Sequence, residues 1–258
     1  MTALLKDINQ MTKPLVTIIT ATTGSKYLEN TLKSIVAQTY ENIQHLVVID
    51  GKHRQDEARR QINKWGSPKT DVVTVPYSVG EGGWNGHRIY GGASYWAQGE
   101  YFIFLDDDNT LDSNHVTDLV DAVTKKPNFC SYSLRKIIDS DGNYVCHDDC
   151  ESLGQWHTIL HPEDFFVDVN CYLIPRNIAI EISPVWYRKF RQPGQMEIDR
   201  AIYHYLSKKY PDFDSTYKYS VNYRAGNTER SVQKEFFLQG NQKMYQIHNG
   251  NLPWKKLV

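Results

Sequence analysis

The stretch Gly99-Glu100-Tyr101-Phe102-Ile103-Phe104-Leu105-Asp106-Asp107-Asp108-Asn109 places five apolar or aromatic residues directly before three carboxylates and an amide. The run from Tyr101 to Leu105 has the length and composition of a strand that is buried on both faces, as in a parallel sheet. In an extended chain, the side chains of Asp106 and Asp108 point to the same side. Two carboxylates about 5 Å apart repel by roughly 3 kcal/mol at an effective dielectric constant near 20. Water around an acidic turn would offset this repulsion, and so would a bound cation.

Three of the predicted strands end in polar residues. Residues 15–105 alternate apolar runs with amphipathic segments, which is the pattern of an α/β fold with a mostly parallel central sheet flanked by helices. Ligands bind such sheets at the carboxyl ends of the strands. These ends carry Thr20-Ala21-Thr22, Asp50 and the acidic cluster, so we expect them to face one crevice. Strands are predicted over residues 15–20, 43–49, 71–75 and 101–105, and helices over 28–36, 56–65 and 89–98.

The pattern changes in the second half of the chain. An Asp-Gly turn at residues 141–142 predicts a hairpin, and the segment from residue 227 is polar, with the apolar residues 236–238 as its only expected anchor. We expect one domain over residues 1–258, with a front half (15–110), a mixed back half (111–226) and a C-terminal tail (227–258). In the back half, helices are predicted over 115–125 and 196–209, and strands over 129–138, 143–146, 167–174 and 217–224.

Charge and composition exclude several classes of protein. The 258 residues include 29 basic and 30 acidic side chains, so no overall field attracts nucleic acid or an anionic membrane. The sequence has neither the apolar stretch of a signal peptide nor the roughly 20 apolar residues of a membrane span. We expect a cytoplasmic protein with reduced cysteines, because Cys146 and Cys150 lack a second ligand pair for zinc. Peripheral membrane association and oligomeric state stay open.

The acidic cluster suits a divalent cation that binds a diphosphate. Mn²⁺ and Mg²⁺ prefer oxygen ligands, and they commonly use one or two carboxylates together with phosphate oxygens and water. A metal there would neutralise charge that develops on a leaving diphosphate. We predict that one of Asp106 and Asp108 binds the metal directly while the other contacts the metal indirectly or a ribose. Asp107 would point into the structure or toward a backbone donor.

Two further residues are candidates for nucleotide binding. The guanidinium of Arg88 could pair with phosphate or a base edge, although a solvated arginine or an ion pair with Glu81 is an equal alternative. Asp50 could accept hydrogen bonds from a base or a ribose, although an aspartate before glycine could equally form a turn.

A second acidic group, Glu197-Ile198-Asp199, opens a predicted helix. An ionised aspartate here could take the proton of an attacking hydroxyl, although acidic residues are also common in first turns because they complement the helix dipole. The loop after residue 147 is polar and aromatic, which fits either a saccharide site or a solvated loop. The predicted acceptor-binding residues are Asp148, Asp149, Glu151, Trp156 and Glu197.

Several of these segments resemble the inverting glycosyltransferases of family 2, which have the GT-A fold. The opening strand Val16–Thr22 is followed by Ser34-Ile35-x-x-Gln38-Thr39-Tyr40, and the second strand by Asp50-Gly51. Ala97-Gln98-Gly99-Glu100-Tyr101 and the Asp-x-Asp at 106–108 are similar to the family's metal-binding strand. Glu197-Ile198-Asp199 resembles the element that supplies its catalytic base. The similarity runs in order over roughly residues 15–206.

The resemblance implies an activity and a set of roles. It implies metal-dependent transfer of a sugar from a nucleotide diphosphate, with UDP favoured, to a hydroxyl of a glycan or glycoconjugate by direct displacement. The front half would bind the nucleotide-sugar and the back half the acceptor. Asp199 would be the base, with Mn²⁺ or Mg²⁺ on Asp108 and Asp106. The nucleotide-sugar would contact Thr20, Ala21, Thr22, Asp50, Arg88, Asp106 and Asp107.

The sequence departs from the family pattern at two places. Ile198 separates a Glu and an Asp that are usually adjacent, and residues 223–227 lack the histidine that helps many relatives hold the metal, so that His248 is the nearest candidate.

Two other functions compete with this interpretation. A nucleotidyltransferase is one rival, but it normally has a glycine-rich phosphate loop after the first strand, where this chain has only Gly24. A noncatalytic glycan-binding derivative is the other, and the intact aspartates argue against it.

Overall fold

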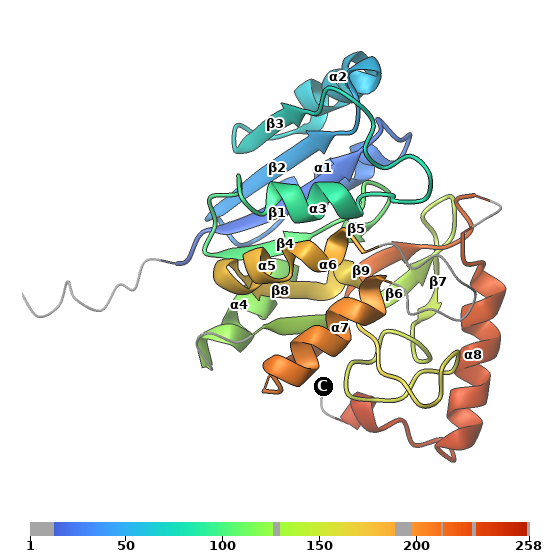
Figure 1. Cartoon of the computed structure of the whole chain (residues 1–258). Helices are drawn as coiled ribbons and strands as arrows, with labels where there is room; N and C mark the ends of the chain where they lie inside the picture. The colour runs from blue at the N-terminus through green and yellow to red at the C-terminus, as the bar shows by residue number, and fades with distance from the viewer. Residues whose placement is uncertain (1–12, 126–129, 189–197, 213, 229–230, 257–258) are drawn as a thin grey trace, which may run out of the picture.

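The computed structural model describes residues 13–125, 130–188, 198–212, 214–228 and 231–256 (Figure 1). Within these ranges nine strands form one sheet in the order β3-β2-β1-β4-β8-β6-β9-β5, with β7 paired to β6. The first four positions are the front half of the sheet, and the remaining strands belong to the back half. The two halves meet where β4 pairs antiparallel with β8.

The front half consists of parallel strands covered on both faces. It contains β1 (Val16–Thr22), β2 (Ile43–Ile49), β3 (Thr70–Thr74) and β4 (Tyr101–Phe104), whose mutual pairings are all parallel. Every residue of β2 is buried, and its side chains alternate between faces. Val47 and Ile49 pack with residues of α1 (Leu28–Val36) and α2 (Gln55–Trp65), whereas Val48 belongs to the larger core on the face of α3 (His87–Ala93). The parallel order therefore brings the carboxyl ends of β1, β2 and β4 to one edge.

The back half mixes parallel and antiparallel pairs. β6 pairs antiparallel with β7 and β8 and parallel with β9, while β5 pairs antiparallel with β9. Figure 1 shows α3, α5, α6 and α7 along one side of the sheet and α8 at the edge of the back half. The bounds are β5 Thr110–Leu111, β6 Ser131–Ile138, β7 Tyr144–His147, β8 Tyr172–Pro175, β9 Asp214–Arg224, α4 His115–Lys125, α5 Arg176–Glu181, α6 Ser183–Trp186, α7 Ile198–Lys209 and α8 Lys234–Ile247. Short 3₁₀ turns occupy Lys52–Arg54, Val169–Cys171 and Pro253–Lys256.

Two predicted elements differ from the structure by five residues at one end. The helix predicted over 89–98 begins at His87 and ends at Ala93, where Gly91 and Gly92 weaken its last turn. The strand predicted over 167–174 begins only at Tyr172, because the carboxylate of Asp168 accepts a hydrogen bond from the backbone of Asn170 and holds a 3₁₀ turn there. The predicted bounds of β2 and α4 are confirmed.

The C-terminal tail contains a helix that the sequence pattern did not indicate. Its buried side is narrow and consists of Phe237, Gly240 and Met244, so the apolar periodicity is weak. A Cβ atom on Gly240 would lie 2.7 Å from Sγ of Cys150, which explains the small residue where the helix meets the loop after β7. No helix in the described ranges has both the length and the apolar character needed to cross a membrane.

Candidate active site

The ends of β1 and β4 meet through Asp107. The hydroxyl of Thr22 donates a 2.5 Å hydrogen bond to Oδ2 of Asp107, and the backbone N–H of Thr23 lies 3.3 Å from the same oxygen. The carboxylate thus points at a backbone donor, as the sequence pattern suggested. The contact fixes the acidic turn at the carboxyl edge of the sheet.

Strand β4 ends at Phe104, and residues 107–108 form a turn. The expectation that one extended strand carries Asp106 and Asp108 was therefore wrong, but the charge of Asp106 still acts on Asp108. Asp106 accepts a 2.5 Å hydrogen bond from the phenol of Tyr90 and a 2.9 Å bond from the side-chain amide of Asn170. Its backbone N–H donates to Oδ1 of the same Asn170 at 2.7 Å. Both oxygens of the Asp106 carboxylate thus accept a hydrogen bond, one from Tyr90 and one from Asn170.

Asp108 lies against the last residue of β9 and the segment that follows it. The amide of Asn227 contacts Oδ2 of Asp108, and Nε of Arg224 donates to the Asp108 carbonyl at 3.0 Å. His248, the histidine nearest in sequence to this stretch, instead packs against Trp254 with ring centroids 5.3 Å apart. The structure therefore places Asn227, and not His248, beside the acidic cluster.

The electrostatics of the cluster favour a cation. Burial and the neighbouring carboxylates raise the pKa of Asp108 to about 8, and burial with the charge of Asp106 raises the pKa of Asp107 to about 6. Among the described residues, Arg224 lowers the pKa of Asp108 but does not outweigh burial and the neighbouring carboxylates, so the ionised cluster requires further positive charge. A divalent ion would supply it and would find hard oxygen donors on Asp108 and Asp106. No group of three His, Cys, Asp or Glu side chains in the described part of the chain could hold a metal alone, so diphosphate oxygens and water would complete the coordination.

The predicted nucleotide contacts at β1 and β2 are partly occupied by the protein itself. Asp50 is 4% exposed, and its carboxylate accepts hydrogen bonds from Ser78 and from the backbone of Val79 and Gly80 at 2.7–3.0 Å. The hydroxyl of Thr20 lies 3.0 Å from Nε2 of His45, inside the sheet. A base could reach Asp50 only if the turn at residues 78–80 moved. These donors lie 28–30 residues further along the chain, so Asp50 is not the local turn-forming residue of the alternative interpretation either.

The glycine-rich segment 78–86 covers these strand ends. A Cβ atom on Gly86 would lie 3.0 Å from Cβ of Ala21, and one on Gly80 would lie 2.8 Å from Oδ2 of Asp50. The segment therefore needs glycine where it passes close to β1 and β2. Arg88 follows it and stacks over the ring of Trp84 at 3.8 Å. Arg88 also borders an apolar hollow of about 410 Å³ beside the sheet, lined by Val48, Val75, Val79, Ile89, Gly92, Trp96 and Tyr187.

Asp199 lies in the first turn of α7 and faces α3. Its Oδ1 is 3.8 Å from Nε2 of His87, and the side chains of the two residues are 27% and 21% exposed. The His87 ring packs against the indole of Trp186, with centroids 5.7 Å apart. Asp199 is thus partly exposed, and its buried Oδ1 lies near a neutral imidazole, because burial lowers the pKa of His87 to about 4. Glu197 falls outside the described residues.

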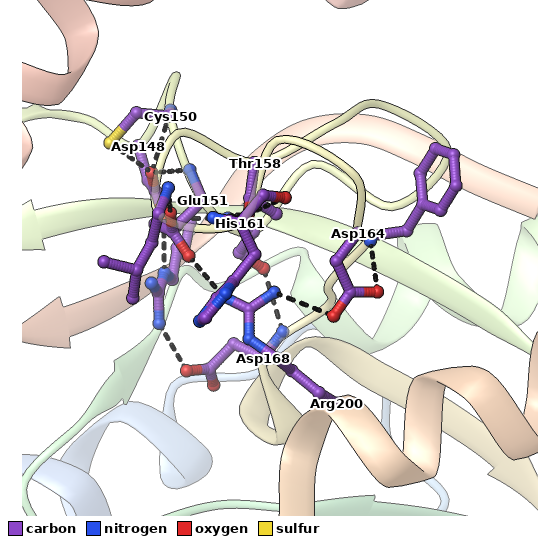
Figure 2. A network of polar contacts seen from close by, with 12 residues as sticks. Asp148, Cys150, Glu151, Thr158, His161, Asp164, Asp168 and Arg200 are labelled. Carbon is purple, nitrogen blue, oxygen red and sulfur yellow. Dashed lines mark hydrogen bonds and ion pairs between the residues drawn. The ribbon is translucent and has the colours of Figure 1, made fainter. Parts of the chain in front are cut away.

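Two of the predicted acceptor carboxylates, Asp148 and Glu151, are buried in internal ion pairs (Figure 2). Asp148 accepts a 2.7 Å hydrogen bond from Nε of Arg135. Burial alone would raise the pKa of Asp148, but the charge and hydrogen bonds of the guanidinium, with backbone donors, have the larger effect, so this pKa is lowered. Glu151 pairs with Arg200 of α7 at 2.7 Å, and Asp149 accepts hydrogen bonds from Tyr219 and Trp254 at 2.5 and 2.9 Å.

This burial corrects the expectation of a saccharide-binding loop. Asp148, Asp149 and Glu151 expose at most 5% of their surface, so their oxygens are almost inaccessible to an acceptor. Trp156 is partly buried and lies 6.0 Å from Trp254, measured between ring centroids. The four residues anchor the loop after β7 to the core and to the C-terminal tail.

Sequence reasoning missed three residues that contact the aspartates. Tyr90 and Asn170 hold Asp106, and Asn227 contacts Asp108. Asn170 is itself oriented by Asp168, whose Oδ1 accepts from its backbone and side-chain N–H groups at 2.9 and 2.7 Å. Asp168 also pairs with Arg135, so a continuous polar network joins Asp148 to Asp106. The Asp-x-Asn spacing at 168–170, which is typical of an Asx turn, was the one local signal for it.

Some known proteins are similar to this chain in sequence, and others are similar to it in fold. The chain is 31% identical over 128 residues to an uncharacterized glycosyltransferase of Rickettsia conorii (strain ATCC VR-613 / Malish 7), which covers 49% of this chain and 20% of that protein. It is 28% identical over 137 residues to an uncharacterized glycosyltransferase of Rickettsia bellii (strain RML369-C), which covers 52% of this chain and 19% of that protein. The chain therefore spans about a fifth of the length of these curated relatives.

Among solved structures, S. aureus TarS 1–349 has the same fold. Its crystal structure matches with a TM-score of 0.59 at 12% identity, over 92% of this chain and 74% of that chain. The complex of TarS 1–349 with UDP-GlcNAc also matches with a TM-score of 0.59, at 13% identity over 94% and 69% of the two chains. At such identities the likeness concerns the fold alone, which is of the GT-A type. The model of the family described as "Glycosyl transferase family 2" matches residues 16–173, and this chain belongs to that family.

Proposed function

We propose that this chain is a metal-dependent inverting glycosyltransferase that moves a sugar from a nucleotide diphosphate, with UDP as the first candidate, to a hydroxyl of a glycan or glycoconjugate. The observation that carries the proposal is the position of Asp199 relative to the acidic cluster. The acidic cluster follows β4, and Asp199 lies in the first turn of α7. Helix α3 lies beside both, because Tyr90 donates a hydrogen bond to Asp106 and His87 lies 3.8 Å from Asp199. The complexes of TarS with UDP and UDP-GlcNAc, which share this fold, support a UDP donor.

Asp108 and Asp106 would hold the metal, which we propose to be Mn²⁺ or Mg²⁺. When bound, it would act as a Lewis acid that stabilises negative charge on the departing diphosphate. Tyr90 and Asn170 keep the Asp106 carboxylate in one orientation. Asp108 has fewer internal hydrogen bonds, and Asn227 is its side-chain neighbour. We therefore assign direct metal binding first to Asp108.

The chemical step would be a single displacement. The acceptor oxygen forms a bond to the anomeric carbon while the bond between that carbon and the diphosphate oxygen breaks, which inverts the configuration. The hydroxyl proton passes to the carboxylate of Asp199, and the electron pair of the broken bond stays on the diphosphate. An aspartate that is ionised at neutral pH suits this role when the acceptor hydroxyl lies within hydrogen-bond reach.

Two measurements test the proposal. Titration calorimetry with UDP, GDP and CDP, each with and without Mn²⁺, should give metal-dependent binding of one nucleotide, and incubation with the matching nucleotide-sugar should release it. Asp199→Asn should retain nucleotide binding and lose transfer by roughly 10²–10⁴-fold. Asp141→Asn, in the exposed turn between β6 and β7, is the matched control and should remain active.

The same assays separate the rival functions. Release of pyrophosphate from a nucleoside triphosphate would indicate a nucleotidyltransferase. Glycan binding without transfer or hydrolysis of any nucleotide-sugar would indicate a noncatalytic derivative. Full transfer activity in Asp199→Asn would reject Asp199 as the base.

A further inference from the structure

Helix α3 presents two side chains to two different parts of the site. His87 and Tyr90 are three residues apart and so lie on the same side of the helix. Tyr90 donates a hydrogen bond to Asp106, and His87 lies 3.8 Å from Asp199. One short helix therefore touches both the carboxylate proposed to bind metal and the carboxylate proposed as base.

A cluster of aromatic rings fixes the position of this helix. The indole of Trp186 packs against His87 and Tyr90, with centroids 5.7 and 5.4 Å apart, and against Phe104 of β4 at 5.1 Å. Ser183 of α6 donates a 2.8 Å hydrogen bond to the carbonyl of Gly91 in α3. A Cβ atom on Gly91 would lie 2.8 Å from the ring of Tyr187, so the two helices are in close contact. The His87 ring thus has little freedom to move.

The surroundings of His87 keep its ring uncharged. Burial lowers its pKa to about 4, so the imidazole is neutral at pH 7. The carboxylate of Asp199 faces it from α7, and the indole of Trp186, which does not titrate, faces it from α6. On α3 itself the nearest titratable group on this face is Tyr90, whose pKa is raised well above its ordinary value by burial, so that it also stays neutral.

We propose that His87 is a positioning residue for Asp199. A neutral imidazole N–H directed at the carboxylate would orient it and favour its ionised form, and it would lower the basicity of the carboxylate less than an imidazolium in an ion pair would. The separation of 3.8 Å is longer than a hydrogen bond, and contacts of this kind often tighten only when substrate binds. Through α3, His87 also sets the distance between the base and Asp106. The inference rests on the proposed function, because it needs Asp199 to be the base.

The test compares His87→Phe, which keeps a flat ring on Trp186, with His87→Gln, which keeps an N–H donor. For His87→Phe we expect kcat to fall by about 10–100-fold, with KM for the nucleotide-sugar within about twofold of the native value. The acid limb of the pH profile should move to higher pH, because a carboxylate without its donor holds its proton more tightly. His87→Gln should restore most of kcat and the native pH profile. His204→Phe removes another His–carboxylate pair on α7, with Asp164, and should change none of these quantities.

Several outcomes would overturn the inference. They are native kcat in His87→Phe, an unshifted pH profile, or equal losses in the Phe and Gln variants. If His87→Phe does not fold, His87→Asn, whose amide is too short to reach Asp199, takes its place in the same measurements. An active Asp199→Asn would reject the proposed function itself. An inactive Asp199→Asn together with a fully active His87→Phe would reject only the positioning role.

Discussion

The phenol of Tyr90 donates a 2.5 Å hydrogen bond to Oδ1 of Asp106 and so joins α3 to the acidic turn after β4. Burial, followed by the charge of Asp106, raises the pKa of Tyr90, so the proton stays on the phenol and Asp106 remains the acceptor. Asn170 holds the other oxygen of Asp106. Of the two proposed metal ligands, Asp108 is therefore the one whose carboxylate oxygens accept fewer hydrogen bonds from the described residues and can more readily bind a cation.

Replacing Asp108 with asparagine should abolish metal-stimulated nucleotide binding. The substitution keeps the size of the side chain but removes the negative charge that a hard cation requires, and we expect Mn²⁺-dependent affinity for UDP to fall by about 100-fold or more. Titration calorimetry with and without Mn²⁺ measures the loss. Asp118→Asn on α4, which removes an ion pair with Lys218 of β9, should leave the affinity unchanged. Native affinity in Asp108→Asn would rule out its role as a ligand.

The sequence predicted well where the strands end, but it did not identify the residues that hydrogen-bond to the aspartates at those ends. β2 and the position of Asp107 follow from local patterns and from the rule that parallel strands end at one edge. The donors that meet the other aspartates come from 16, 64 and 119 residues away, and no local pattern identifies them. The sequence suggested a saccharide site or a solvated loop for the carboxylates at 148–151, because their cationic partners lie far away in the chain, on β6 and α7. Ion pairs between distant elements depend on tertiary packing, which periodicity does not encode.

Asn227 should contribute to metal affinity. Its amide now contacts Oδ2 of Asp108, and an amide can turn its oxygen toward a cation instead. We expect Asn227→Ala to weaken Mn²⁺ binding by about tenfold, and Asn227→His to retain it, because imidazole is also a Mn²⁺ ligand. Electron paramagnetic resonance of free Mn²⁺ measures the affinity without any turnover.

Asn143→Ala, in the exposed turn after β6, is the control for this series and should bind Mn²⁺ normally. Equal affinity in the native protein and in Asn227→Ala would show that Asn227 is not part of the metal site.

Arg135→Met should destabilise the fold strongly. Arg135 is almost fully buried and pairs with both Asp148 and Asp168, so the substitution leaves two buried carboxylates without their cation. Breaking such a network costs about 3–5 kcal/mol, whereas Arg60→Met, which breaks an exposed pair with Glu57, should leave the free energy of unfolding almost unchanged. Urea denaturation at pH 7.5 gives both values. A loss in Arg135→Met no larger than that in Arg60→Met would contradict the structural role of the network.

His45 should make the fold less stable in acid. The residue is 2% exposed, and burial lowers its pKa to about 3, against about 6.5 for a histidine in the unfolded chain. Between these values the unfolded chain binds a proton that the native protein does not, so the free energy of unfolding falls as the pH falls below 6.5. His45→Asn removes this contribution. The difference in unfolding free energy between the native protein and the variant should therefore shrink by about 2–3 kcal/mol from pH 7.5 to pH 4.5. Urea denaturation at both pH values measures the difference, with His53→Asn, whose side chain is exposed, as the control. A difference that stays constant with pH would mean that His45 becomes protonated without unfolding of the sheet.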